Sequence, residues 1–162
     1  MAHYQMRQKL VSIGDDYWIE DELGQRVYKV DGKALRLRKT LIVEDAHGAQ
    51  LYKIQERKLR IRDTMEIEDS AGHTVAKVKK KRINLLREGW TVTVSDGPDI
   101  AVKGNIVDHE YRLERGRDQI AQVSKRWFRM ADTYGVDVAP DQNQALILAI
   151  AAVLDSTAHE RR

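Results

Sequence analysis

The densest cluster of charged side chains in the sequence is the cationic run KVKKKR at Lys77–Arg82, with Arg87 five residues later. Cations packed this closely could hold the phosphates of lipid headgroups or of nucleic acid, at about 1 kcal/mol per basic residue near an anionic membrane. The same run also suits a solvated strand and turn, in which lysines discourage edge-to-edge pairing. Both interpretations stay open. The candidate ligand-binding residues are Lys79, Lys80, Lys81, Arg82 and Arg87.

Four arginines form a second possible patch: Arg36, Arg38, Arg60 and Arg62. They occupy matching positions in two similar segments, ALRLRKTLIVED and KLRIRDTMEIED, so equivalent hairpins would project them alike. The alternative is that each arginine pairs with a carboxylate on the neighbouring strand, which stabilises a sheet. We favour this pairing.

The side chains that could perform catalysis do not form a recognisable site. The spacings of the five histidines do not match a zinc site. They are His3, His47, His73, His109 and His159. His47 and His73 adjoin turn glycines, so we expect both to be exposed.

His109 and Ser124 are two further residues that could take part in catalysis. His109 lies between Asp108 and Glu110, but three neighbours in a strand alternate faces and cannot converge. We therefore predict a structural role for His109. Ser124 has no base that the sequence identifies, and the chain has no cysteine. We expect a protein that is not an enzyme and that carries no metal and no cofactor.

The large aromatic residues fall in segments that we predict to be strands. We expect them to lie in the core or in a girdle around it, rather than to serve as stacking platforms for bases. They are Trp18, Trp90, Trp127 and Phe128.

Composition narrows the class of protein. The 28 basic and 25 acidic residues give a net charge of +3 over 162 residues, which is modest for a nucleic-acid-binding protein. The absence of cysteine suits a reducing compartment. The N-terminal residues MAHYQMRQKL contain no apolar signal-peptide core. We therefore expect one cytoplasmic domain.

An internal repeat with a period of 24 residues organises the first half of the chain. Its three copies have the same spacing of Glu-Asp, Gly and Lys, and they align without a gap. Periods of this size indicate a repeated supersecondary unit. The copies are DYWIEDELGQRVYKV, TLIVEDAHGAQLYKI and TMEIEDSAGHTVAKV, which start at Asp16, Thr40 and Thr64.

Each copy predicts two strands and two turns. Apolar residues alternate with charges, which is typical of half-buried strands. The Asp-x-x-Gly sequence predicts a turn, because Asp accepts hydrogen bonds from the backbone ahead and Gly adopts positive φ freely. For the second turn we predict a three-residue loop, Arg62–Thr64, which would set Arg60 opposite Glu66 and Leu59 opposite Ile67.

Strand patterns continue beyond the repeat. GWTVTVSDGPDIAVKG and HEYRLERGRDQIAQVSK each read as two strands around a turn, and TYGVDV adds another strand. The total is about twelve short strands without an intervening helical period, which indicates an antiparallel meander.

The end of the chain predicts a helix. Ala145–Leu154 contains no polar side chain, and Pro140 and Asp141 are helix start signals. A helix that is apolar on all sides must be surrounded. Its length of about 15 Å is half of the hydrocarbon thickness of a bilayer, so a core helix is favoured over a membrane-inserting tail.

The strands and the helix together predict one architecture. A barrel of about eight strands fills its own interior, whereas about twelve strands leave a wider lumen. A helix about 10 Å across would fill that lumen. We predict a mainly β fold: a closed antiparallel barrel over residues 4–138, a central hydrophobic helix over 141–155 and a polar tail over 156–162.

Three segments resemble the LURP-one-related family, within the tubby C-terminal-like superfamily that includes phospholipid scramblases. They are GNIVDHEY, VSKRWFRMADTYGVDV and ALILAIAAVLD, and the resemblance covers residues 4–155. It implies a twelve-stranded barrel around a hydrophobic helix. Tubby domains bind phosphoinositides through basic residues, but their binding positions do not match this chain. Scramblases have Cys-rich and Ca²⁺-associated segments that this chain lacks.

These observations lead to a functional expectation with alternatives. We expect a non-enzymatic binding module that contacts anionic phospholipid headgroups or a protein partner through its basic barrel exterior. The alternatives are a structural or interaction protein without a small ligand and, less favoured, a nucleic-acid-binding protein. We expect no transmembrane span.

Overall fold

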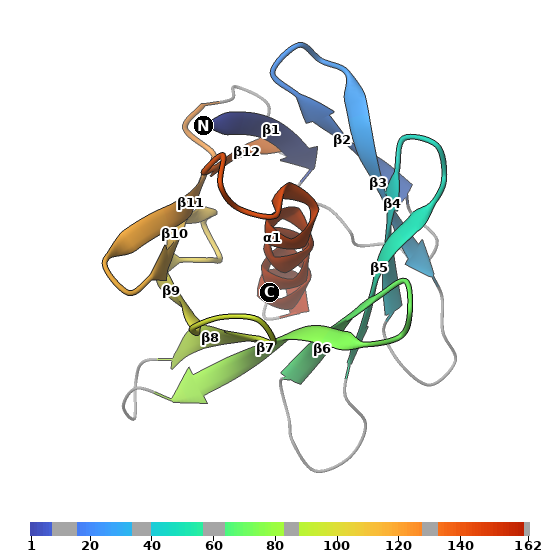
Figure 1. Ribbon diagram of the computed structural model, residues 1–162. Helices are drawn as coiled ribbons and strands as arrows, with labels where there is room; N and C mark the ends of the chain where they lie inside the picture. The colour runs from blue at the N-terminus through green and yellow to red at the C-terminus, as the bar shows by residue number, and fades with distance from the viewer. Residues whose placement is uncertain (8–15, 34–39, 57–63, 83–87, 128–132, 161–162) are drawn as a thin grey trace.

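The computed structural model describes residues 1–7, 16–33, 40–56, 64–82, 88–127 and 133–160. In these residues, twelve antiparallel strands form a closed barrel around a helix, α1 (Gln144–Glu160), as Figure 1 shows. The strands are β1 (Ala2–Arg7), β2 (Asp16–Asp21), β3 (Arg26–Lys33), β4 (Thr40–Asp45), β5 (Gln50–Glu56), β6 (Thr64–Asp69), β7 (Thr74–Arg82), β8 (Glu88–Val94), β9 (Ile100–Asn105), β10 (Glu110–Arg115), β11 (Asp118–Ser124) and β12 (Thr133–Val138).

The barrel closes where its first strand meets its last. β1 pairs antiparallel with β12, so that Ala2 lies opposite Val138 and Arg7 opposite Thr133. The remaining strands pair with their neighbours in sequence. The predicted fold class, a closed antiparallel barrel of about twelve strands that encloses a hydrophobic C-terminal helix, is confirmed.

The Asp-x-x-Gly turns of the repeat share one geometry. In the second copy, Asp45 Oδ1 accepts the N–H groups of His47 at 2.8 Å and Ala49 at 3.0 Å. Gly48 has φ = 86°, where a side chain would be strained. The same two hydrogen bonds form at Asp21 and at Asp69. In all three copies, the register of the strand pairing shifts between the two residues that precede the aspartate. The turn prediction is therefore confirmed.

The predicted three-residue turn at Arg62–Thr64 is wrong. Glu66 lies opposite Gln55 rather than Arg60, and Ile67 lies opposite Ile54 rather than Leu59. β5 ends at Glu56, and residues 57–63 are outside the described residues. Alternation alone cannot choose between the two pairings, because apolar and polar residues alternate both in β5 and in the segment after it.

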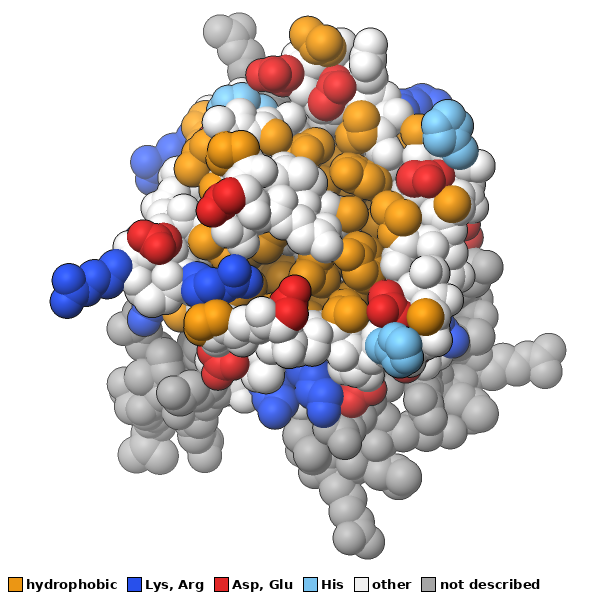
Figure 2. All heavy atoms as spheres, in the orientation of Figure 1, with side chains coloured by type: hydrophobic (Ala, Val, Ile, Leu, Met, Phe, Trp, Pro, Cys, Tyr) orange, Lys and Arg blue, Asp and Glu red, His pale blue; other side chains and the backbone are white. Residues whose placement is uncertain are grey.

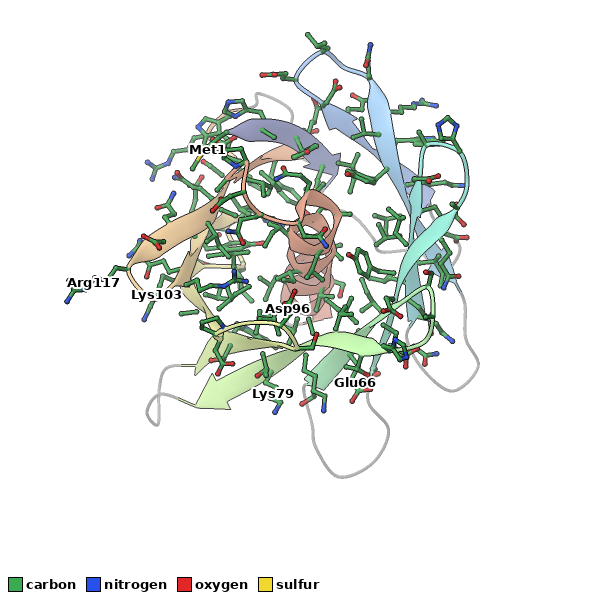
Figure 3. All side chains as sticks on the ribbon, in the orientation of Figure 1. Met1, Glu66, Lys79, Asp96, Lys103 and Arg117 are labelled. Carbon is green, nitrogen blue, oxygen red and sulfur yellow. The ribbon has the colours of Figure 1, made fainter. Side chains whose placement is uncertain are left out.

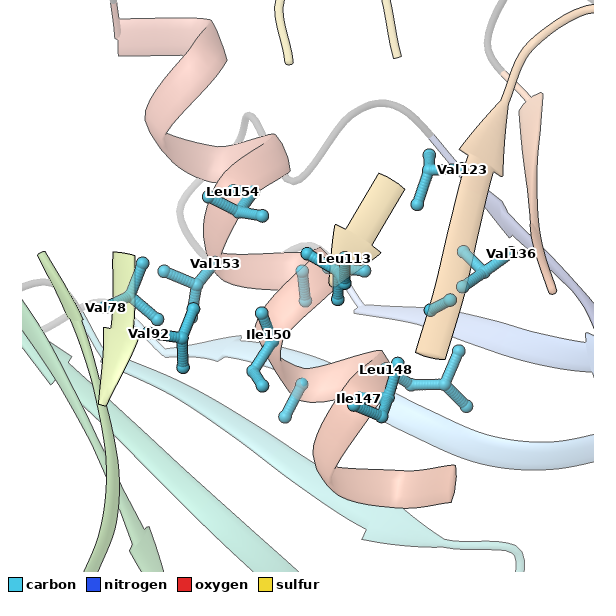
Figure 4. Packing of buried hydrophobic residues seen from close by; sticks show 14 of the residues in the cluster. Val78, Val92, Leu113, Val123, Val136, Ile147, Leu148, Ile150, Val153 and Leu154 are labelled. Atoms are coloured by element: carbon cyan, nitrogen blue, oxygen red, sulfur yellow. The ribbon is translucent and has the colours of Figure 1, made fainter. Parts of the chain in front are cut away.

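Helix α1 is buried on all sides, as its composition predicts. Ile147–Leu154 are each at most 2% exposed. Figure 4 shows Val153 pointing toward Val78 on β7 and Val92 on β8, with Leu148 on another side of the helix. Each fully buried large apolar side chain contributes about 1.5–3 kcal/mol, so the helix supplies much of the core.

The beginning of α1 is tied to the barrel by polar contacts. Asn143 Oδ1 accepts the N–H of Leu146, which caps the first turn. The Asn143 side chain also donates to Tyr52 Oη at 3.0 Å, and Tyr4 Oη donates to Gln144 at 3.1 Å. At the other end the helix continues past Asp155 into the segment expected to be a polar tail. Ser156 is 2% exposed there and donates to the carbonyl of Val153.

The end of the barrel where α1 begins also carries the Asp-x-x-Gly turns. Figure 2 shows this end, with carboxylate and histidine side chains around the rim and apolar side chains at the centre. The helix ends at the opposite end, where β7 and β11 also end.

Candidate functional site

The cationic run on β7 does not present all of its side chains on one face. Ala76 and Val78 face the interior and are at most 2% exposed. Lys79 therefore faces outward and is exposed, whereas Lys80 lies in the inward row, half-buried, opposite Trp90. Figure 3 shows Lys79 pointing away from the barrel. Strand alternation thus separates two of the candidate residues.

The other residues of the predicted basic patches are beyond what the structure describes. For Lys81 and Arg82 it describes the backbone, which belongs to β7, and not the side chains. Arg87 and the arginines at positions 36, 38, 60 and 62 lie outside the described residues. Ligand binding by the five selected residues therefore stays a prediction.

A group of exposed cations lies on the outer surface of β7–β11, and we call it the basic wall. Lys103 and Arg112 face each other across β9 and β10. Figure 3 shows Lys103 pointing outward, as Lys79 does. The residues of the basic wall are Lys79, Lys103, Arg112 and Arg126.

Carboxylates accompany part of the basic wall. Arg112 Nε lies 2.6 Å from Glu114 Oε1, and Arg126 Nε lies 3.7 Å from Glu110 Oε1. The exposed Asp108 is held by Asn105, whose amide donates to Asp108 Oδ2 at 2.7 Å. Two of the four cations of the basic wall, Arg112 and Arg126, are therefore accompanied by a carboxylate. Sequence reasoning selected only Lys79 of these four residues, because Lys103, Arg112 and Arg126 lie in other segments of the chain, outside the cationic run.

Trp127 lies on a turn after β11 and is 45% exposed, so its predicted place in a strand, in the core or in a girdle, is wrong. Ser124 ends β11, and its Oγ donates to the Glu110 carboxylate at 2.9 Å. The N–H of Lys125 also donates to Glu110, and the N–H of Arg126 donates to Ser124 Oγ. These bonds hold the turn that follows the strand. Phe128 is outside the described residues.

The other two tryptophans agree with a core or girdle position. Trp90 is 6% exposed and belongs to the core. Trp18 is half-buried on β2, with the Arg26 guanidinium 5.3 Å and the Lys29 ammonium 6.0 Å from its ring centroid. These distances are typical of cation–π contacts.

A buried polar cluster lies close to the end of α1, and sequence reasoning missed its main partner. His109 Nε2 is 2.6 Å from Asp155 Oδ1, and the two side chains are 1% and 0% exposed. The premise that His109 sits in a strand is wrong: it lies in the turn before β10, with φ = 53°. The predicted structural role agrees with this burial. The carboxylate that contacts His109 is that of Asp155, and not that of its sequence neighbours Asp108 or Glu110.

Two tyrosines complete this cluster. The Tyr134 ring lies 4.4 Å from the His109 ring, measured between centroids. Burial raises the pKa of Tyr111 far above its usual value, and the charge of Asp155 raises it further. Tyr111 therefore stays neutral. The cluster is closed to solvent, so its groups fix the helix against the barrel rather than meet a substrate.

The remaining histidines and the acidic residues do not form a metal site among the residues that the structure describes. His47 and His73 are exposed beside the turn glycines, as predicted. His3 contacts Asp137 across β1 and β12. The side chain of His159 is not described.

No helix in the described part of the chain has the length and apolar character needed to cross a membrane.

Comparisons with known proteins identify the family of the chain and a solved structure with a similar fold. A family model described as LURP-one-related matches residues 2–155. An X-ray structure of a protein from Arabidopsis thaliana superposes with a TM-score of 0.69 at 19% sequence identity, covering 96% of this chain and 91% of that chain. At this identity the likeness concerns the fold alone. No protein with a curated description matches the chain.

Proposed function

The chain belongs to the LURP-one-related family, and from that premise we propose that it is a non-enzymatic binding module. Its ligand is an anionic phospholipid surface, which it contacts through the basic wall. The observation that supports this proposal is the exposure of Lys79, Lys103, Arg112 and Arg126 on the part of the barrel that runs from β7 to the turn after β11.

The spacing of the basic wall favours a surface over a single small anion. β7 and β11 are four strands apart, which corresponds to about 20 Å along the curved wall. No small anion bridges that span, whereas a membrane with anionic lipids offers negative charge across it. Lys79 and Lys103 each contribute about 1 kcal/mol near such a surface, and Arg112 and Arg126 contribute less because a carboxylate accompanies each of them.

The buried cluster supports a role other than catalysis. His109 and Asp155 form the kind of pair that could transfer a proton, but neither side chain reaches solvent. A general base has to approach the proton that it removes, within about 3 Å or through one water. Burial in the folded barrel prevents that approach.

Co-sedimentation with vesicles tests the proposed function. We expect the protein to bind vesicles of phosphatidylcholine mixed with phosphatidylserine at low salt, less at high salt, and not to bind phosphatidylcholine alone. The variant K79Q/K103Q/R112Q/R126Q should bind on the order of a hundredfold more weakly. The control R26Q/K53Q removes two cations on β3 and β5, outside the basic wall, and should bind like the wild type.

Two results would contradict the proposal. The first is the absence of wild-type binding to the anionic vesicles at low salt. The second is an equal loss in the control and in the basic-wall variant. A gel-shift titration with nucleic acid at low salt serves as a parallel check, because tight binding there would favour the less favoured alternative. Changing Lys79–Arg82 to serine tests the sequence-based prediction separately.

A further inference from the structure

Trp127 differs from the other two tryptophans in what surrounds it. Trp90 is buried and Trp18 lies under cations, whereas Trp127 is 45% exposed. Among the described residues, the large hydrophobic side chains that are exposed are Met1, Leu23 and Trp127. A single exposed apolar residue needs no explanation by itself. The geometry of the turn supplies the further argument.

The backbone of this turn is fixed before any ligand arrives. The Ser124 side chain is 2% exposed and donates to both Glu110 oxygens, at 2.9 and 3.0 Å. The N–H groups of Lys125 and Arg126 donate to Glu110 and Ser124 at 3.2 and 3.1 Å. A ligand that meets Trp127 therefore spends little free energy on ordering the turn, which favours binding.

The neighbours of Trp127 identify the chemistry of the surface that it fits. Lys125 is half-buried, and the Arg126 side chain is 84% exposed. Tryptophan is enriched at membrane interfaces, where its amphipathic ring lies among the headgroups. Cations beside it meet the negative surface potential of an anionic leaflet. An apolar ring flanked by cations, at one edge of the basic wall, thus complements an anionic bilayer.

We propose that Trp127 inserts into the headgroup region of an anionic bilayer and that the basic wall lies against the surface beside it. This inference rests on the proposed function, because the basic wall supplies the attraction. Trp127 adds a fixed point of contact, which sets the orientation of the barrel. The side of the barrel that carries the basic wall then lies on the membrane, tilted so that the end where α1 ends is nearer to the surface than the Asp-x-x-Gly turns.

The test uses the full chain and vesicles of phosphatidylcholine and phosphatidylserine, with or without bromine atoms on the acyl chains near the headgroups. Bromine quenches tryptophan fluorescence at short range. We expect brominated vesicles to quench the wild type and W18F, and most of this quenching to disappear in W127F. W127A should lower the vesicle partition coefficient about tenfold, which corresponds to 1.4 kcal/mol. The control W18A should leave it close to the wild-type value.

The outcomes separate this inference from the proposed function. If W127A binds like the wild type and W127F is still quenched, Trp127 does not insert, while loss of binding in K79Q/K103Q/R112Q/R126Q keeps the proposed function. If the wild type does not bind the anionic vesicles, both the insertion of Trp127 and the proposed function are contradicted. Equal melting temperatures for W127A and the wild type show that the exposed substitution leaves the fold intact.

Discussion

At the residue scale, the contact between His109 and Asp155 predicts a large effect on stability. Removing one partner of a buried polar pair leaves the other desolvated and uncompensated. We expect D155A to lower the free energy of unfolding by about 3–5 kcal/mol, measured by urea denaturation. D155N keeps the size of the side chain and one oxygen acceptor, so it should lose less. A D155A protein within about 1 kcal/mol of the wild type would contradict this assignment.

The aspartates of the second and third copies, Asp45 and Asp69, predict a dependence of stability on pH. The N–H groups of Ala49 and His47 donate to Asp45 and hold its pKa below the usual value. A carboxyl with a lowered pKa in the folded state stabilises the protein above its unfolded pKa, about 3.9. That stability disappears as the pH falls through the folded pKa.

The variant D45N removes this titration. We expect the urea midpoint of the wild type to fall between about pH 5 and pH 2, and D45N to fall less steeply over the same range. E22Q removes a carboxylate from the equivalent turn of the first copy while Asp21 still accepts the N–H groups of Leu23 and Gln25. It should keep the wild-type slope. Identical slopes for D45N and the wild type would exclude the proposed effect.

Sequence reasoning failed at the residue scale where partners are distant along the chain. His109 and Asp155 are 46 residues apart, so no local pattern connects them. One signal was available: Asp155 follows an entirely apolar stretch of a helix that had to be surrounded, and a carboxylate so placed requires a partner. The position of Trp127 was predicted incorrectly, because residue types do not reveal which backbone N–H groups donate hydrogen bonds to Ser124 and Glu110.

At the element scale, two glycines predict costs of different origin. Gly48 has φ = 86° and no atom within 4 Å of an added Cβ, so G48A introduces conformational strain alone, about 1–2 kcal/mol. Gly104 has φ = 117°, and an added Cβ would lie 2.5 Å from the Glu110 carbonyl oxygen on the neighbouring strand. G104A should therefore destabilise the protein more than G48A in thermal unfolding. The reverse order would show that β9 and β10 can separate without cost.

Helix α1 predicts the effect of burying a charge. Leu148 and Ile150 are 0% exposed, so L148K or I150D places an unpaired charge inside the barrel. We expect both variants to fail to fold, with loss of the near-ultraviolet circular dichroism. L23K is the matched control, because Leu23 is 77% exposed. A soluble L148K protein that melts cooperatively would contradict the burial.

The sequence predicts elements well where turn chemistry is explicit. Asp-x-x-Gly states both the hydrogen-bond acceptor and the residue with positive φ, and all three copies have the predicted geometry. The pairing of β5 with β6 was predicted incorrectly, because the segment between them has no such signal. Alternation fixes which residues share a face, and it leaves the offset between two strands open.

At the scale of the whole molecule, helix α1 occupies the interior of the twelve-stranded barrel, which the strand side chains alone would not fill. A chain that ends at Val138 keeps every strand and loses the apolar core of α1. We expect it to aggregate or to remain expanded, as measured by size-exclusion chromatography and near-ultraviolet circular dichroism. A chain that ends at Glu160 is the control and should fold. A compact monomer of the shorter chain would refute this role of the helix.

The overall architecture could be predicted because two sequence features require each other. An entirely apolar helix needs a complete enclosure, and about twelve strands need something to enclose. The binding surface could not be predicted in the same way. Lys79, Lys103 and Arg112 come together through strand pairing, which the sequence does not state, and a surface charge leaves no periodic pattern.

The pairing of the first strand with the last has a consequence for biosynthesis. His3 contacts Asp137, which the ribosome adds 134 residues later. Throughout translation the nascent N-terminal hairpins therefore expose an unsatisfied edge and an unfilled apolar face, since their final neighbours do not yet exist. We therefore expect the barrel to close only after β12 and α1 have been synthesised. Until then, chaperones that bind nascent chains can bind the exposed apolar face.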